Sequence, residues 1–290
     1  MIKNLFLVVF ILGFLITTSS TFASPSNTQQ AQKTNQIWEK LNQKKLKLKS
    51  ESALVVDKHG NLVYHKSTDT SMPIASITKL MTAIVILDSK LPLDEKITIT
   101  KDDRDLVRLT GSRLKYGASL TRKELIQLAL MSSENRAAAA LGRTYPGGTK
   151  AFVKAMNRKA RSLGMNHSHF ADAAGLKAEN IASPKDLVTL LRTSKNYSLI
   201  HQATTQKQLT VYPYRKKGPL KYVNTNRLLK NKKWDIELSK TGYINEAGRC
   251  LVMEAEIVGE PLFIVLLNSY GKLTPFGDAN RLRKWIESGI

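Results

Sequence analysis

The sequence predicts an α+β protein in which helices flank one antiparallel sheet of about five strands. Strand-like runs occur near the start and the end of the chain, and apolar residues with helical spacing fill the middle. Because the two kinds of element are segregated along the chain, the first and last strands are expected to meet in one sheet. A length of 290 residues with 42% hydrophobic residues provides a sizeable core, which excludes a disordered basic tail.

The first 23 residues have the features of a secretory signal peptide. Lys3 precedes an apolar run over residues 5–16, and small residues allow cleavage after about Ala23. The alternative is an uncleaved anchor, but a run of about a dozen residues is short of the ~20 needed to span a bilayer. We therefore predict export to the periplasm, with a mature protein that associates with a membrane at most peripherally.

Residues 24–51 are predicted to form a flexible basic lead-in to a catalytic domain over 52–290. Residues 24–36 are rich in Ser, Thr, Gln and Asn, a composition that disfavours a packed core. Four lysines follow at Lys44, Lys45, Lys47 and Lys49. We interpret them as a solvated stretch, with contact to an anionic surface as the alternative.

The elements of the catalytic domain follow from the spacing of its apolar residues. Strands over 53–56 and 62–64 are joined by a turn at 57–60, which indicates a β-hairpin. Apolar residues three and four apart predict helices over 76–89, 121–131, 149–163, 184–193 and 278–288. Strands return at 236–239, 250–258 and 262–267, the last two joined at 259–261.

Charge and cysteine content limit the function classes. The formal net charge of +22 makes nucleic acid, anionic lipid and acidic polymers eligible partners, but an exported protein rarely meets nucleic acid. Cys250 is the single cysteine, so it forms neither an intramolecular disulfide nor a thiolate zinc cluster. We expect it to be a small buried residue. The histidines show no metal-ligand spacing, and neither a metal nor a cofactor is expected; they are His59, His65, His167, His169 and His201.

Three short motifs in a fixed order carry the predicted chemistry. S-x-x-K occurs three times, S-x-N twice and Lys-Thr-Gly once. In one ordered set, the serine of the first motif begins an apolar helix, the second motif ends another helix, and the third lies on a strand. That set is Ser76 with Lys79, Ser133 with Asn135, and Lys240-Thr241-Gly242.

The first motif brings a hydroxyl to an amine. Ser76 and Lys79 are three residues apart, so they share one face of a helix. Burial on an apolar helix and the nearby Lys240 should lower the pKa of Lys79 below its solution value of ~10.4. Lys79 is thus the predicted general base, and Ser76 the nucleophile.

The other two motifs supply proton transfer and binding. Ser133 is predicted to relay the proton to the leaving amine, and Asn135 to bind the substrate amide. Lys240 and Thr241 would face an anionic group. Gly242 would let the strand approach the substrate, and the backbone N–H groups of Ser76 and Tyr243 would form the oxyanion hole.

In this order the three motifs resemble those of the penicillin-binding serine peptidases. The longer segments 73–83, 129–138 and 240–252 are similar to the D-alanyl-D-alanine carboxypeptidase family, and segments 91–96 and 285–287 to its short endopeptidase branch. The resemblance implies the penicillin-binding/β-lactamase-like serine transpeptidase fold with a helical subdomain. Longer members of the family carry an additional domain and an amphipathic membrane anchor after the catalytic domain. Because only 48 residues follow Gly242, neither part is expected here.

The resemblance also implies an activity. It is hydrolysis of D-alanyl peptide bonds in peptidoglycan through an acyl-enzyme on Ser76, with acylation by β-lactams. An endopeptidase for D-Ala-meso-diaminopimelate cross-links is favoured, and a carboxypeptidase removing terminal D-Ala is the alternative. Remoter alternatives are a non-catalytic peptidoglycan-binding protein and a class A β-lactamase. The β-lactamase class needs a Glu-x-x-Leu-Asn pattern, which Glu179-Asn180 does not fit.

Overall fold

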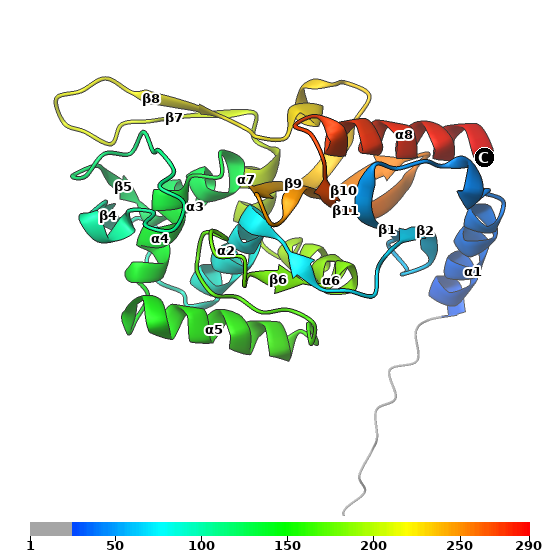
Figure 1. Ribbon diagram of the computed structural model, residues 1–290, viewed down its shortest axis with the longest axis horizontal. Helices are drawn as coiled ribbons and strands as arrows, with labels where there is room; N and C mark the ends of the chain where they lie inside the picture. The colour runs from blue at the N-terminus through cyan, green and yellow to red at the C-terminus, as the bar shows by residue number, and fades with distance from the viewer. Residues whose placement is uncertain (1–24) are drawn as a thin grey trace, which may run out of the picture.

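A five-stranded antiparallel sheet forms the centre of the computed structural model, which describes residues 25–290 (Figure 1). The strand order is β2-β1-β11-β10-β9. The first strand pairs with the last, with Val55 opposite Ile264, as the sequence predicts. The strands are β1 Ser50–Asp57, β2 Leu62–Lys66, β9 Asp235–Ile244, β10 Gly248–Ile257 and β11 Glu260–Ser269.

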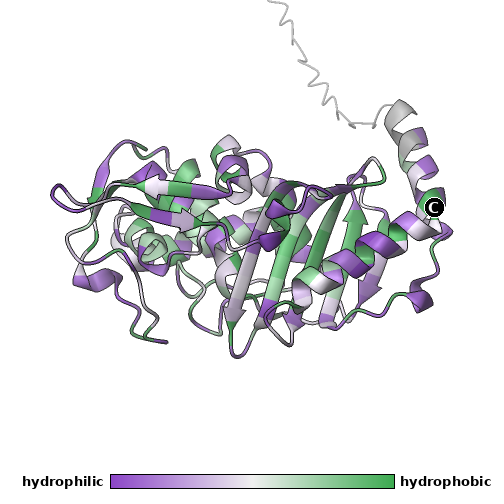
Figure 2. Cartoon of the chain, turned by 90° about the horizontal axis from the view of Figure 1, so that it is seen from above, coloured by the Kyte–Doolittle hydropathy of each residue, from purple (hydrophilic) through white to green (hydrophobic). Residues whose placement is uncertain are grey.

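The central strands are apolar on both faces because both faces are covered. In β1, Leu54 and Val56 belong to a core shared with the helical part of the molecule, whereas Ala53 and Val55 belong to a second core under α8 (Thr274–Gly289). This alternation follows from the period of two in a strand. Figure 2 shows the strands mainly in the colour of hydrophobic residues, which explains why they read as continuous apolar runs.

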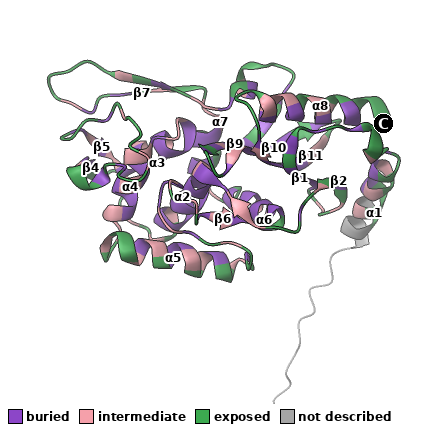
Figure 3. Ribbon diagram, in the orientation of Figure 1, coloured by how far each residue is buried: buried purple, intermediate pink, exposed green. Residues whose placement is uncertain are grey.

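All five predicted helices are present within a few residues of their predicted bounds. They are α2 Thr78–Asp88, α3 Arg122–Met131, α5 Gly148–Ser162, α6 Pro184–Ser194 and α8. Two further helices, α4 Asn135–Arg143 and α7 Ser198–Thr205, escaped prediction, because eight or nine residues show too few turns for a clear period. Burial is heaviest in α2 and the sheet, while α5 exposes its outer face (Figure 3).

Short strand pairs were not predicted either. They are β3 Met72–Pro73 with β6 Ile181–Ala182, β4 Lys96–Thr98 with β5 Ser119–Thr121, and β7 Gln208–Val211 with β8 Leu220–Val223. The 3-10 turns are η1 Gln43–Lys45, η2 Ala75–Ile77, η3 Lys101–Asp103 and η4 Arg227–Lys230. The β10–β11 turn is Val258-Gly259, one residue earlier than predicted, and both residues have positive φ, as tight hairpins require.

The prediction of a flexible lead-in over 24–51 is wrong for the part that the structure describes. Residues Pro25–Glu39 form α1, and the Trp38 indole donates a hydrogen bond of 3.0 Å to Asp57 Oδ2. Leu46 and Leu48 are buried in the second core, while the lysines between and beside them are exposed. The sparse apolar residues of this segment are anchors to the sheet, and its polar composition concealed them.

The predicted signal peptide over 1–23 lies outside the described residues. Within residues 25–290, no helix combines the length and apolarity needed to cross a bilayer.

The packing of α1 predicts a measurable contribution to stability. Trp38→Ala removes a buried ring and should lower the free energy of unfolding by ~3 kcal/mol, measured by urea denaturation. Trp38→Phe keeps most of the apolar contact and loses one hydrogen bond, so its loss should be ~1 kcal/mol. Equal stability of Trp38→Ala and the parent protein would show that the segment before β1 is not part of the core.

Candidate active site

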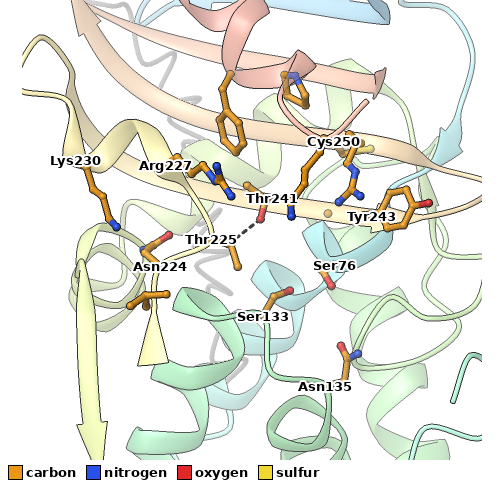
Figure 4. A pocket seen from close by; sticks show the side chains of 16 residues that line it. Ser76, Ser133, Asn135, Asn224, Thr225, Arg227, Lys230, Thr241, Tyr243 and Cys250 are labelled. Atoms are coloured by element: carbon orange, nitrogen blue, oxygen red, sulfur yellow. Dashed lines mark hydrogen bonds between the residues drawn. The ribbon is translucent and has the colours of Figure 1, made fainter. Parts of the chain in front are cut away.

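A cleft of about 710 Å³ runs between β9 and the helical part of the molecule. Ser76, Ser133 and Asn135 lie on one side of it, and Thr241 and Tyr243 on the opposite strand (Figure 4). Gly242 also lines the cleft, whereas the amines of Lys79 and Lys240 are buried. The three motifs are therefore brought together from segments far apart in the sequence.

Ser76 lies in a tight turn that leads into α2. It is the middle residue of η2, and α2 begins two residues later at Thr78. The preceding Ala75 has a φ of 48°, in the left-handed region that residues with a Cβ seldom adopt. Gly175 packs against this turn so closely that a Cβ on it would lie 1.9 Å from the Ala75 carbonyl oxygen. Packing thus holds the strained Ala75 in place, and with it the position of Ser76 in the cleft.

The amine of Lys79 is fully buried and lies among three oxygens. Its Nζ is 2.7 Å from Ser76 Oγ, 2.8 Å from Asn135 Oδ1 and 2.6 Å from the Ala174 carbonyl oxygen. Burial lowers the pKa of Lys79 to about 7, against the opposing effect of nearby carboxylates. In its charged form the amine donates to all three oxygens. In its neutral form two N–H groups can donate to Asn135 Oδ1 and the Ala174 carbonyl oxygen, which leaves the lone pair to accept the proton of the Ser76 hydroxyl.

The lowered pKa of Lys79 agrees with the sequence prediction, which named burial and the nearby Lys240 as causes; burial is the one that lowers it. The amine of Lys240 has a pKa well below its usual value as well, first through burial and then through the nearby Lys79. Two buried amines this close disfavour a state in which both are charged.

A short hydrogen-bond chain that sequence reasoning missed orients Asn135. Its Nδ2 donates to Thr110 Oγ1 at 2.9 Å, and the Thr110 hydroxyl donates to Asp105 Oδ2 at 2.7 Å. Burial disfavours the charged form of Asp105, but hydrogen bonds from Arg108, Thr110 and Val107 lower its pKa overall. The carboxylate therefore fixes the Thr110 hydroxyl, and the Oδ1 of Asn135 is left to face Lys79.

The Ala174 carbonyl is held by a second unpredicted network. Asp172 Oδ1 accepts hydrogen bonds from the backbone N–H groups of Ala174 at 2.7 Å and Gly175 at 2.6 Å. Asn180 Nδ2 donates to the other carboxylate oxygen of Asp172 at 2.9 Å. This loop presents a backbone carbonyl to the amine, a contact that leaves no side-chain signature in the sequence.

Ser133 and Lys240 form the second pair in the cleft. Ser133 lies between α3 and α4 with a φ of 61°, and its Oγ accepts a hydrogen bond of 3.0 Å from Lys240 Nζ. The hydroxyl of Thr241 bonds that of Thr225 at 2.7 Å (Figure 4). Thr225 and the adjacent Arg227 line the cleft beside β9, and neither was singled out from the sequence.

Gly242 makes a close contact that the sequence analysis did not anticipate. A Cβ there would lie 2.8 Å from the Ile74 carbonyl oxygen and 3.1 Å from the Ser76 nitrogen. The close approach that requires glycine is thus between β9 and the turn that carries Ser76. Tyr243, the next residue, is exposed, and the Arg249 guanidinium lies 3.7 Å from its ring centroid.

The other S-x-x-K occurrences, Ser112/Lys115 and Ser269/Lys272, and the other S-x-N occurrence, Ser194/Asn196, do not form a second site of this kind. Ser269 Oγ bonds Ser50 Oγ in the sheet, and Ser194 Oγ donates to Leu190 O within α6. Lys272 lines the far end of the cleft without its serine. Cys250 is buried in β10, and burial raises the pKa of its thiol to about 12, so it is a neutral thiol at physiological pH, as expected of a buried residue.

A serine hydroxyl against a buried lysine amine with a lowered pKa is typical of serine acyl-transfer enzymes with a lysine base. Residues 39–271 match the family described as D-alanyl-D-alanine carboxypeptidase, and the chain belongs to this family of serine peptidases. The sequence resemblance is therefore confirmed.

The chain is similar to two curated enzymes named D-alanyl-D-alanine endopeptidase. It is 48% identical over 243 residues to the one from Pseudomonas aeruginosa and 46% identical over 241 residues to the one from Escherichia coli. Each alignment covers 83% of this chain and 78% of the relative. Among solved structures, the Streptomyces K15 DD-transpeptidase is similar with a TM-score of 0.77 and 28% identity, over 83% of this chain and 98% of that one. The predicted fold class is thereby confirmed.

The packing of Gly242 predicts a catalytic defect from one added methyl group. Gly242→Ala should slow acylation by a fluorescent penicillin roughly 10- to 100-fold, because displacement of reacting groups by ~1 Å can cost about 100-fold. Gly218→Ala is the matched control, since a Cβ there meets no heavy atom within 4 Å. Thermal unfolding of both variants separates misplacement from loss of fold. An unchanged acylation rate for Gly242→Ala would contradict the proposed tight contact between β9 and the Ser76 turn.

Proposed function

We propose that this protein is a DD-endopeptidase that hydrolyses D-Ala-meso-diaminopimelate cross-links in peptidoglycan. The observation that carries the proposal is the buried Lys79 amine 2.7 Å from Ser76 Oγ, at the floor of a cleft bordered by an edge strand. The names of the two enzymes at 46–48% identity support the endopeptidase activity.

Acylation would begin with attack of Ser76 Oγ on the D-Ala carbonyl carbon. The serine proton moves to Lys79 Nζ, and the carbonyl oxygen becomes an oxyanion that the N–H groups of Ser76 and Tyr243 stabilise. The C–N bond then breaks as the proton held by Lys79 is relayed to the leaving amine through Ser133 Oγ, which lies 3.0 Å from Lys240 Nζ. Lys79 is then neutral again. The products are an ester on Ser76 and a free amine.

Hydrolysis of the ester would complete the reaction. Neutral Lys79 takes a proton from water, the hydroxide adds to the ester carbonyl, and the bond to Ser76 Oγ breaks. The serine regains its proton from Lys79, and a peptide carboxylate is released.

Substrate binding would use the opposite wall of the cleft. Because β9 is an edge strand, a stem peptide can lie along it, with Asn135 binding a peptide amide. The D-centre that carries the leaving amine also carries a carboxylate, which Lys240 and Thr241 would face. The Arg227 side chain lines the same part of the cleft and adds positive charge.

The second candidate is a DD-carboxypeptidase, because the family to which the chain belongs has that description. Both reactions attack the same carbonyl and differ in the size of the leaving group. The cleft is also lined by Lys230, Lys272 and Phe276, and its volume of about 710 Å³ is larger than a single leaving D-Ala requires. This larger volume favours the endopeptidase.

We further propose that the protein acts in the periplasm after cleavage of its signal peptide near Ala23. The peptidoglycan activity named for its relatives and the apolar start of the sequence support this location. Partners would be peptidoglycan stem peptides and β-lactam antibiotics.

The pKa of Lys79 predicts how acylation depends on pH. Deprotonated Lys79 is the base, so the rate of Ser76 acylation by benzylpenicillin should rise about tenfold for each pH unit below about 7 and level off above it. Intact-protein mass spectrometry after rapid quenching measures this rate, and it should also detect a long-lived adduct. Lys79→Met should acylate far more slowly and without this pH dependence. Rapid turnover of benzylpenicillin without an adduct would instead indicate a β-lactamase.

Purified muropeptides decide between the two peptidase reactions. We expect cross-linked dimers to be converted to monomers at least tenfold faster than terminal D-Ala is removed from pentapeptide monomers, measured by liquid chromatography. The Ser76→Ala variant is the control and should cleave neither substrate while it keeps the parent melting temperature. Faster release of D-Ala from monomers would favour the carboxypeptidase instead.

A further inference from the structure

Positive charge is concentrated in one segment beside the cleft. Residues 206–234 contain nine lysines and arginines and no aspartate or glutamate. We refer to these nine side chains as the basic ridge: Lys207, Arg215, Lys216, Lys217, Lys221, Arg227, Lys230, Lys232 and Lys233. This short segment therefore carries nine charges of the formal +22 of the whole chain.

The cations of the basic ridge are available to a partner. All nine side chains are exposed, and none forms an ion pair with a carboxylate in the part of the chain that the structure describes. Tyr212, which lies beside them, is 71% exposed. Like charges without counter-charges repel one another, so an external anion would stabilise this surface.

Contacts with residues 113–119 fix the hairpin that carries four of the nine ridge side chains. The backbone N–H of Ser119 donates to the Pro213 carbonyl at 2.9 Å, and that of Lys115 donates to the Tyr214 hydroxyl at 2.7 Å. The Arg113 guanidinium lies 4.0 Å from the Tyr222 ring centroid. The tip between β7 and β8 extends beyond these contacts (Figure 1), so its charges are displayed on an arm with a defined direction.

The ridge runs directly into the cleft. Strand β8 ends at Val223, which lines the cleft together with the following Asn224 and Thr225, and then with Arg227 and Lys230 of η4 (Figure 4). A strand rises ~3.3 Å per residue, so the tip lies roughly 20 Å from the cleft. A partner on the ridge is thus close enough to be part of the same polymer as the bond being cut.

We infer that the basic ridge binds the carboxylates of the peptidoglycan strand that adjoins the cross-link in the cleft. This inference rests on the proposed function, since it assumes that the cleft holds a peptidoglycan stem. The continuity of ridge and cleft favours this polymer over an anionic bilayer. In addition, the tip is Arg215-Lys216-Lys217-Gly218-Pro219, without the large apolar side chains that insert into a membrane interface.

Two variants of equal charge test the inference. The ridge variant carries Arg215→Gln, Lys216→Gln, Lys217→Gln and Lys221→Gln, all outside the cleft lining. The matched control carries Lys150→Gln, Lys154→Gln, Arg158→Gln and Arg161→Gln on exposed positions of α5, which lies at the opposite end of the helical part in Figure 1. Each variant lowers the net charge by four.

Binding is measured by co-sedimentation with purified insoluble peptidoglycan at low ionic strength, in a Ser76→Ala background that leaves the polymer intact. The ridge variant should bind about tenfold more weakly, because it loses four charges at the proposed contact, and the control should bind within about twofold of the parent. Salt should weaken binding of the parent more steeply than that of the ridge variant. With Ser76 present, both variants should acylate with benzylpenicillin at the parent rate.

The outcomes separate the inference from the proposed function. Equal loss of binding in both variants, or in neither, overturns the ridge as the binding surface. The inference is also overturned if the ridge variant loses binding to phosphatidylglycerol vesicles but retains binding to peptidoglycan. That result would indicate that the ridge binds a lipid surface instead. If the parent cleaves no cross-linked muropeptide, the proposed function fails, whatever the sedimentation shows.

Discussion

The burial of one amine determines how the rest of the site is built. Lys79 Nζ has no contact with solvent, and the three oxygens around it come from the Ser76 turn, the start of α4 and the 172–180 loop. A buried ammonium is costly, and a buried neutral amine with two acceptors is not. The site therefore favours the form of lysine that can remove a proton, but only after these separate segments have folded against one another.

The backbone conformation at the site also costs free energy. Ala75 and Ser133 both have left-handed φ values, each unfavourable by ~1–3 kcal/mol for residues with a Cβ. Two glycines allow the compensating contacts, because Gly175 packs on the Ala75 carbonyl and Gly242 on the Ser76 nitrogen. The edge strand β9 thus has two functions. It borders the proposed substrate groove on one side and holds the nucleophile turn in place.

The sequence predicted contacts between residues that are close together along the chain and missed contacts between residues that are far apart. Spacing alone placed Ser76 next to Lys79, and the apolar runs predicted the sheet and five helices. Thr110 lies 25 positions before Asn135, and nothing in that separation indicates a contact. The Ala174 oxygen belongs to the backbone, which every residue possesses. The segment before β1 was predicted to be flexible because its composition is mostly polar. Trp38 and the leucines after it are isolated among polar residues, so the composition did not reveal that they pack against the sheet.

The distribution of acidic residues explains why so much positive charge reaches the surface. Asp57, Asp105, Asp172 and Asp278 each accept backbone N–H groups that would otherwise lack partners in turns and loops. Asp57, Asp105 and Asp278 are buried, so these carboxylates are not available as surface partners for the basic ridge. Lysine and arginine, with long side chains, remain in solvent. Several acidic groups thus accept hydrogen bonds within loops, and the basic ridge beside the cleft has no carboxylate partner among the residues that the structure describes.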